Sequence, residues 1–129
     1  MTRFSLTLLF TVFSFIGFSQ TDTSGMIYDM PEIMPEFVGG ADALDDFIKK
    51  NIKYPVEAKE QGIQGKVYVQ FVVEKDGTVT NVTVRRGAHT LLDNEAVRVV
   101  KLMPAWKPGT MRGKKVRVRY TLPITFSLS

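Results

Sequence analysis

Residues of the types that perform catalytic or metal chemistry are few in this sequence of 129 residues, and none is spaced for it. The chain contains one histidine, His89, which stands beside Thr90, and it contains no cysteine. Zinc in proteins normally takes three or four protein ligands, so His89 alone predicts no metal site. Asp45 and Asp46 are adjacent, and because a helix directs adjacent side chains apart, they do not form a catalytic pair of carboxylates.

The glycines do not form a phosphate-binding loop either. The segment from Gly62 to Gly65 lacks the Lys-Ser or Lys-Thr ending of such a loop and follows no predicted strand. No nucleophile, base and orienting residue form a recognisable set. The sequence therefore predicts no catalytic residue, no cofactor and no small-molecule substrate, and it favours a binding module over an enzyme.

The clearest pattern is a strict alternation of apolar and polar residues near the C-terminus. One face of this predicted strand carries Val116, Val118, Tyr120, Leu122, Ile124 and Phe126. The other face carries Lys115, Arg117, Arg119, Thr121 and Thr125. Such alternation is typical of a strand with one face on the core and one in water. Pro123 has no backbone donor and therefore predicts a position at a sheet edge.

A basic edge strand of this kind has two interpretations. The first is that it pairs with another extended chain, because an open edge offers backbone hydrogen bonds and alternating side-chain pockets. The positive charges would then speed the encounter with an acidic peptide. The second is that Lys114, Lys115, Arg117 and Arg119 are charges that prevent edge-to-edge aggregation. A second copy of the chain, forming a homodimer through this edge, is a further candidate partner.

Charge is divided unevenly along the chain, although the formal net charge is only +4. From Gln20 to Glu60 there are nine acidic residues and four lysines, a net charge of −5. From Gln61 onward there are twelve basic and four acidic residues, a net charge of +8. The basic half suits an acidic partner or the acidic half of the same molecule. Nucleic acid is not expected as a partner, because the basic residues lack interleaved stacking aromatics.

The N-terminus has the pattern of an export signal. Arg3 precedes an apolar run from Phe4 to Phe18, and small residues at Gly17 and Ser19 stand at the −3 and −1 positions of a possible cleavage site. We therefore predict a cleaved signal peptide over residues 1–19, with an uncleaved signal anchor in the inner membrane as the alternative. Residues 20–40 are predicted to be an extended lead-in, and residues 41–127 the domain.

Two helices are predicted in the first half of that domain. Asp42 is expected to cap a helix whose apolar stripe consists of Leu44, Phe47, Ile48 and Ile52. Pro55 is expected to open a second, short helix that ends at Gly62. The lead-in is expected to attach to the domain through Phe37.

The second half of the domain reads as two strands, a helix and a last strand. The strands Lys66–Val73 and Val79–Arg85 are joined by a hairpin turn that contains Asp76-Gly77. A helix follows with Leu92, Ala96, Val99, Val100 and Met103 on one face, and Pro104 ends it. Trp106 is expected to pack over the end of the sheet. The fold class is therefore α+β, a three-stranded antiparallel sheet with helices packed on one face.

Several short motifs occur in an order that carries a family resemblance. They are Tyr54-Pro55, Ala58, Gly62-Ile63-x-Gly65, the alternation Val67 to Val73, Asp76-Gly77-x-Val79, Glu95-Ala96, Trp106-x-Pro108-Gly109 and Pro123-Ile124-x-Phe126. In this order they resemble the C-terminal domain of the TonB family of energy transducers, in the form common among Bacteroidetes-like sequences. The resemblance extends from about Met34 to Ser127.

The resemblance implies a location, a partner and a mode of binding. Domains of this family lie in the periplasm and hold the TonB box, a short N-terminal segment of an outer-membrane transporter, as a strand added to their last strand. The partner-binding residues it implies are Tyr54, Pro55, Lys115, Val116, Arg117, Val118, Arg119, Tyr120, Thr121 and Leu122. For Tyr54-Pro55, a device that marks a helix boundary is the alternative interpretation. The family's Pro-rich stalk has no counterpart between Gln20 and Pro35, so we expect binding rather than complete transduction.

Overall fold

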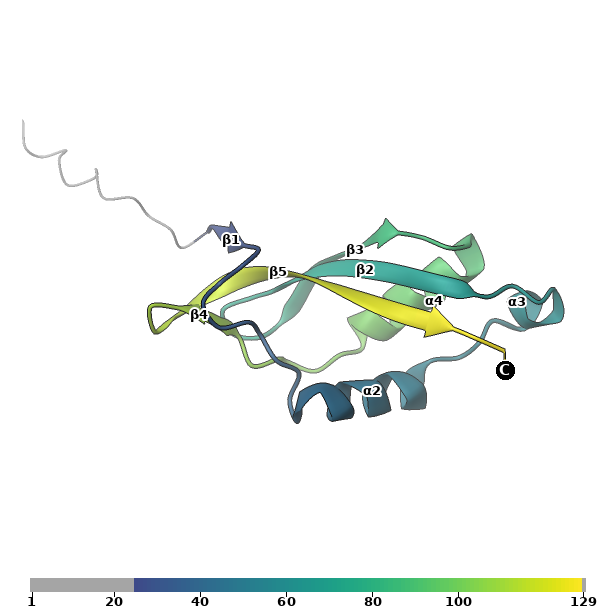
Figure 1. Cartoon of the computed structure of the whole chain (residues 1–129), viewed down its shortest axis with the longest axis horizontal. Helices are drawn as coiled ribbons and strands as arrows, with labels where there is room; N and C mark the ends of the chain where they lie inside the picture. Colours follow the sequence, from purple (N-terminus) through teal and green to yellow (C-terminus); the bar gives the residue numbers. More distant parts are fainter. Residues whose placement is uncertain (1–24, 129) are drawn as a thin grey trace, which may run out of the picture.

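The computed structural model describes residues 25–128, which contain both strands and helices (Figure 1). The signal-peptide prediction for residues 1–19 therefore lies outside the described residues. The elements in order are β1 (Ile27–Tyr28), α2 (Gly40–Asn51), α3 (Val56–Glu60), β2 (Gly65–Val73), β3 (Val79–Arg86), α4 (Thr90–Lys101), β4 (Gly109–Met111) and β5 (Lys114–Phe126). No helix within residues 25–128 has the length and apolar character needed to cross a membrane.

The sheet has β2 and β5 at its centre, in the order β1-β5-β2-β3, and β4 also pairs with β5. The antiparallel register between β2 and β5 runs from the pair Gly65 and Phe126 to the pair Val73 and Val118. Strands β2 and β3 are antiparallel as well, with irregularities in their register. The three predicted strands and their antiparallel pairing are thus confirmed. The short strands β1 and β4 were not predicted, so the sheet has five strands rather than three.

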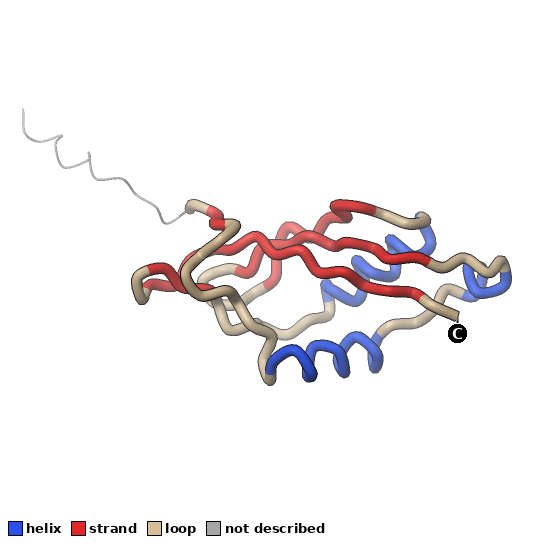
Figure 2. The backbone as a smooth tube through the Cα atoms, viewed as in Figure 1, coloured by secondary structure: helices blue, strands red, loops and turns tan. Residues whose placement is uncertain are grey.

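The two long helices lie on one face of this sheet, α4 against β2 and β3 and α2 toward β5 (Figure 2). The apolar residues of β2 and β5 that alternate in the sequence point to this face and form the core, together with Leu44 from α2 and Leu92, Ala96 and Val100 from α4. The described residues include no buried charged side chain. The predicted α+β fold with helices on one face is confirmed.

The start of α2 differs from the prediction. The helix begins at Gly40, and Gly39 occupies the N-cap position with a left-handed φ of 96° and without a side-chain cap. Asp42 lies in the first turn instead of capping the helix. Glycine adopts a left-handed φ at little cost, and here the chain turns sharply at Gly39 before a carboxylate cap could be placed. Lys49 and Lys50 lie in the last turn, where positive charge suits the helix dipole.

The caps of α3 and α4 also refine the prediction. Pro55 is the N-cap of α3 rather than its first helical residue. His89 caps α4: its Nδ1 accepts a hydrogen bond of 3.1 Å from the amide of Leu91. Helix α4 ends at Lys101, so Met103 follows the helix instead of lying within it. The imidazole of His89 therefore has a local structural role.

The lead-in is attached to the domain more firmly than the sequence indicates. Phe37 is only 7% exposed, and its ring lies 5.6 Å from the rings of Phe47 and Trp106. Ile33 and Glu36 form antiparallel bridges to residues just before or within β4. Pro31 and Pro35 are buried. The lead-in from residue 31 to Phe37 is therefore part of the folded domain.

Candidate peptide-docking site

The residues predicted to bind a partner lie mostly on β5, and the pleat of the strand separates them into two groups. Val116, Val118 and Leu122 are buried, and Tyr120 is half-buried. Lys115, Arg117, Arg119 and Thr121 are on the opposite face and are partly or fully exposed. Because successive side chains of a strand point to opposite sides, the charges lie on the face that the helices leave uncovered.

Arg117 is engaged by the chain itself. Its Nε lies 2.7 Å from Oε1 of Glu74, and its Nη2 donates a second bond of 3.1 Å to Oε2. The hydrogen bond from Arg117 holds the pKa of Glu74 below its ordinary value, and Glu74 in turn raises the pKa of Arg117. Nη1 of Arg117 also donates to the carbonyl oxygen of Gly25 at 3.0 Å. The three bonds fix this guanidinium at the junction of β5, the hairpin and the lead-in.

Arg119 is paired with the lead-in. Its Nη1 lies 2.7 Å from Oδ1 of Asp29, and both side chains remain substantially exposed, at 38% and 66%. The two residues line an open hollow of about 580 Å³ together with Gln70, Arg85 and Thr121. Lys115, by contrast, has no acidic partner within salt-bridge distance among residues 25–128. Two arginines and one carboxylate, that of Asp29, line the hollow, which is therefore positively charged.

Strand β1 lies directly beside these arginines. Ile27 and Tyr28 pair with Arg117 and Val118 in a parallel arrangement. The edge of β5 was predicted to be open along its length, and β1 covers it at these two positions. From Arg119 to Phe126, no strand of the described chain pairs with β5 on the side away from β2. The open part of the edge is therefore its C-terminal part.

Pro123 shows which backbone groups face this open edge. It lies opposite Tyr68 of β2, and because proline has no N–H, this pair cannot exchange two backbone hydrogen bonds. Residues of an antiparallel strand alternate between bonded and non-bonded pairs. The amide groups of Thr121 and Thr125 therefore point away from β2, while those of Leu122 and Ile124 point toward it. Thr121 and Thr125 offer the free donors at the edge.

Tyr54 and Pro55 lie at the other end of β5. The hydroxyl of Tyr54 donates to the carbonyl oxygen of Ile63, and its ring packs edge-on against Phe126 at 5.7 Å. Phe126 pairs with Gly65, the first residue of β2, while Lys115 pairs with β4. The structure thus does not bring Tyr54 and Pro55 together with the N-terminal half of β5. Both have structural contacts at this helix boundary.

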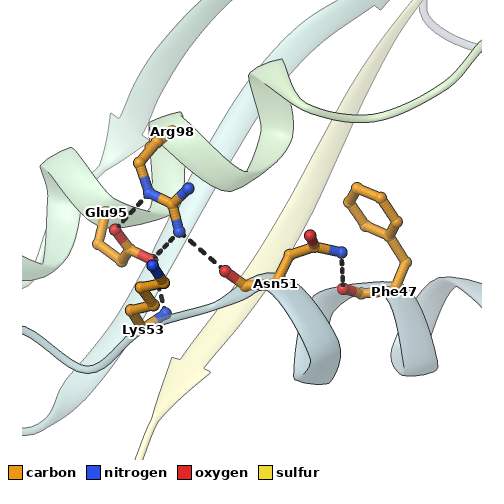
Figure 3. Close-up of polar contacts among 5 residues, drawn as sticks. All are labelled: Phe47, Asn51, Lys53, Glu95 and Arg98. Carbon is orange, nitrogen blue, oxygen red and sulfur yellow. Dashed lines mark hydrogen bonds and ion pairs between the residues drawn. The ribbon is translucent and has the colours of Figure 1, made fainter.

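A polar network holds the segment before Tyr54 in place (Figure 3). Oε2 of Glu95 on α4 accepts the amide of Lys53 at 2.6 Å, and Arg98 donates to the carbonyl of Asn51 at 2.8 Å. Arg98 also forms two bonds with Glu95. Burial works to raise the pKa of Glu95, but the bonds from Arg98 and Lys53 outweigh it and leave that pKa below its ordinary value. The network fastens the end of α2 to α4.

Tyr120 belongs to an aromatic cluster under the sheet. Its ring lies 5.0 Å from the ring of Trp106 and 5.6 Å from that of Phe71. Trp106 is 3% exposed, so its predicted place as a cover over the sheet is confirmed. Aromatic pairs at such distances add to the energy of burial. The cluster packs against the buried face of β5.

Sequence analysis missed Glu74, Asp29 and β1 as parts of this site. Glu74 is 43 residues from Arg117, and Asp29 is 90 residues from Arg119. No local pattern links residues so far apart. The uneven charge of the two halves pointed to pairs such as Asp29 and Arg119, but it gave no signal for Glu74, which lies in the basic half with Arg117. Within residues 25–128 there is also no group of three acidic or histidine side chains arranged to hold a metal ion.

Comparison with known proteins agrees with this geometry. A family model described as "Gram-negative bacterial TonB protein C-terminal" matches residues 50–128, which is more than half of the chain. The chain belongs to the TonB C-terminal family. The match begins at the end of α2 and continues past the end of β5, so it includes the whole of β5, whereas β1 lies outside it.

Proteins of known name and structure are similar to the same region. Protein TonB from two strains of Xanthomonas campestris pv. campestris is 33% identical over 90 residues, which is 65% of this chain and 39% of each relative. This TonB-family chain therefore matches well under half the length of those relatives. The solution structure of the C-terminal domain of Helicobacter pylori TonB has a TM-score of 0.53 and 26% identity, and covers 67% of this chain and 78% of that one.

Proposed function

We propose that this domain captures an extended segment of an outer-membrane transporter in the periplasm by adding it as a strand to β5. The TonB C-terminal family supports a role in the energised transport system to which such transporters belong. The observation that carries the proposal is the edge of β5 from Arg119 to Phe126, which no strand of the described chain covers on the side away from β2. Binding, and not catalysis, is the activity proposed.

Three features of the site support peptide capture. The amides of Thr121 and Thr125 face outward, and each backbone hydrogen bond they form contributes on the order of 1 kcal/mol net. The buried face of β5 is fixed by the aromatic cluster, so the strand is held in shape before a partner arrives. Arg119 of β5 and Arg85 of β3 give the hollow over the outer face of the sheet a positive charge that suits an acidic peptide.

The experiment is a binding measurement on a proline variant of the edge. Thr121 is exposed and its amide faces away from β2, so Thr121→Pro removes an edge donor without removing a bond to β2. Val118 is a poorer site for this change, because it is fully buried. We expect Thr121→Pro to weaken binding of N-terminal transporter peptides by more than about tenfold, which corresponds to roughly 1.4 kcal/mol.

Thr121→Ala is the matched control, because it removes the same side chain and keeps the amide. It should bind within about twofold of the unchanged protein in titration calorimetry. Equal affinity of the proline variant and the alanine variant would count against strand addition at this edge. Concentration-dependent dimerisation that is lost in the proline variant, without peptide binding by any form, would instead favour a self-associating domain.

A further inference from the structure

The N-terminal end of the β5 edge, at Arg117 and Val118, is already paired with a strand from the same chain, directly beside the open part that would receive a partner. Strand β1 pairs with Arg117 and Val118, Asp29 bonds to Arg119, and the carbonyl of Gly25 accepts a bond from Arg117. Each contact is of the kind that an incoming acidic peptide would make, namely backbone pairing and a carboxylate on an arginine. The segment from Gly25 to Met30, which we call the plug, has the chemistry of the proposed ligand.

The plug is held weakly. It contributes a strand of only two residues, and neither Ile27 nor Tyr28 is fully buried. Met26 and Met30 are exposed, Met30 at 83%. The ion pair between Asp29 and Arg119 is itself exposed, and exposed ion pairs contribute little to stability because water and salt screen them. These contacts are few enough for a competing strand to replace them.

The chain that follows the plug is held firmly. Pro31, Pro35 and Phe37 are buried, and the amides of Ile33 and Glu36 bond to the carbonyls of Thr110 and Lys107 at 3.1 and 3.0 Å. A boundary between weakly and firmly held backbone therefore lies between Met30 and Pro31. The plug can leave the edge at this boundary without disturbing the core, because none of its side chains belongs to the core.

We propose that the plug is an intramolecular competitor for the docking edge, which a partner strand displaces as it binds along β5. This inference rests on the proposed function and deepens it. The partner it fits is an extended peptide with an acidic residue opposite Arg119 and apolar residues where Ile27 and Tyr28 now lie. Because a site that is only fractionally open binds with reduced apparent affinity, the plug lowers the affinity of the domain for weak or mismatched peptides.

The first test loosens the plug in the full chain. Asp29→Lys replaces the partner of Arg119 with a like charge, and Glu36→Lys is the matched control: it makes the same charge change in the firmly held part of the lead-in. We expect Asp29→Lys to bind acidic transporter peptides about fivefold to tenfold more tightly than the unchanged protein. Glu36→Lys should show only the smaller gain that follows from added positive charge.

The second test fastens the plug. The chain has no cysteine, and Ile27 and Arg117 are direct neighbours across the parallel pair. Paired residues on neighbouring strands lie close enough for a disulfide to join them. In the variant Ile27→Cys with Arg117→Cys, the oxidised form should lose at least about tenfold in peptide affinity relative to the reduced form of the same protein. Equal affinity of the two forms would overturn the competition.

The outcomes separate this inference from the proposed function. If every form binds the peptides equally well, strand addition stands and the plug is not a competitor. Hydrogen exchange at the amides of Arg117 and Arg119, measured without peptide, reports directly whether Asp29→Lys frees the edge. If Asp29→Lys frees the edge and neither the unchanged protein nor any variant binds a peptide, capture of transporter peptides is overturned. The competitor proposal is then overturned with it.

Discussion

At the scale of single residues, the site depends on two arginines with different surroundings. Arg117 is fixed by two bonds to Glu74, whereas Arg119 has one exposed ion pair with Asp29. A partner's carboxylate can replace Asp29 at Arg119 without breaking the contact between β5 and the hairpin. Arg119 is therefore the residue of β5 that we expect to recognise an acidic peptide, and Arg117 the one that shapes the strand.

Reversing the charge of Arg119 tests this difference. We expect Arg119→Glu to weaken binding of acidic peptides by about fivefold or more at low salt, because an attraction becomes a repulsion. The effect should shrink at high salt, which screens exposed charges. Lys101→Glu on α4 makes the same change away from β5 and serves as the control. Equal loss of binding in both variants, measured by calorimetry, would contradict a local role for Arg119.

The pair of Glu74 and Arg117 predicts a pH dependence of stability. The pKa of Glu74 is lowered in the folded protein, chiefly by the hydrogen bond from Arg117. Its stabilising contribution is therefore fully present above the ordinary value of 4.5 and is lost as the pH falls through the lowered folded-state pKa. Urea unfolding at pH 7 should show that Glu74→Gln is less stable than the unchanged protein.

At acidic pH the two proteins should become alike. As the pH falls below 4.5 and through the lowered folded-state pKa of Glu74, the unchanged protein progressively loses the ionised form of this side chain, and the difference in unfolding free energy narrows. Glu60→Gln on α3 is the control, since the side chain of Glu60 is exposed and takes part in none of the ion pairs of residues 25–128. A gap that is constant from pH 7 to acidic pH would show that the ion pair does not contribute.

At the scale of elements, the contact between the end of α2 and α4 is a further prediction. Glu95 accepts the amide of Lys53 and two bonds from Arg98, and its side chain is only 11% exposed. Glu95→Ala leaves that amide without its acceptor, and we expect a loss of about 1–2 kcal/mol in the free energy of unfolding. The control variant Glu57→Ala on α3 should lower the free energy of unfolding by a smaller amount. Equal losses in chemical denaturation would contradict the role of the network.

The elements that could be predicted from the sequence are those with a long internal pattern. Strands β2 and β5 are nine and thirteen residues long and alternate over most of that length, and the apolar stripes of α2 and α4 recur at helical spacing. The turn was recognisable from the Asp76-Gly77 pair, which is typical of hairpins. Gly77 has a φ of 89°, a conformation that favours glycine. Each of these features depends on residues that are close together in the sequence, so the sequence alone predicts it.

The elements that escaped prediction depend on contacts between distant residues. Strand β1 has two residues, and only its pairing with β5 defines it as a strand. Two residues cannot show an alternation. The predicted capping of α2 by Asp42 was wrong, because the N-cap is Gly39, three residues earlier. In the candidate site, the outward-facing side chains of β5 could be predicted from the alternation. The pairing of the plug with Arg117 and Val118 could not.

At the scale of the whole molecule, the uneven charge acts partly within the chain. The acidic half contributes Asp29 to the basic strand β5, and Arg98 of the basic half bonds to the backbone of Asn51 in the acidic half. Lys114 and Lys115 are left exposed without acidic partners within salt-bridge distance in the described chain. Both lysines lie at the start of β5, where it pairs with β4 (Figure 1).

The measurement that tests strand addition most directly is amide exchange by NMR on the isotope-labelled protein, with and without a saturating N-terminal transporter peptide. The amides of Thr121 and Thr125 should exchange quickly in the free protein and become protected in the complex. Those of Leu122 and Ile124 should be protected in both states, because they face β2. Peptide binding that leaves Thr121 and Thr125 as exposed as before would contradict strand addition to β5.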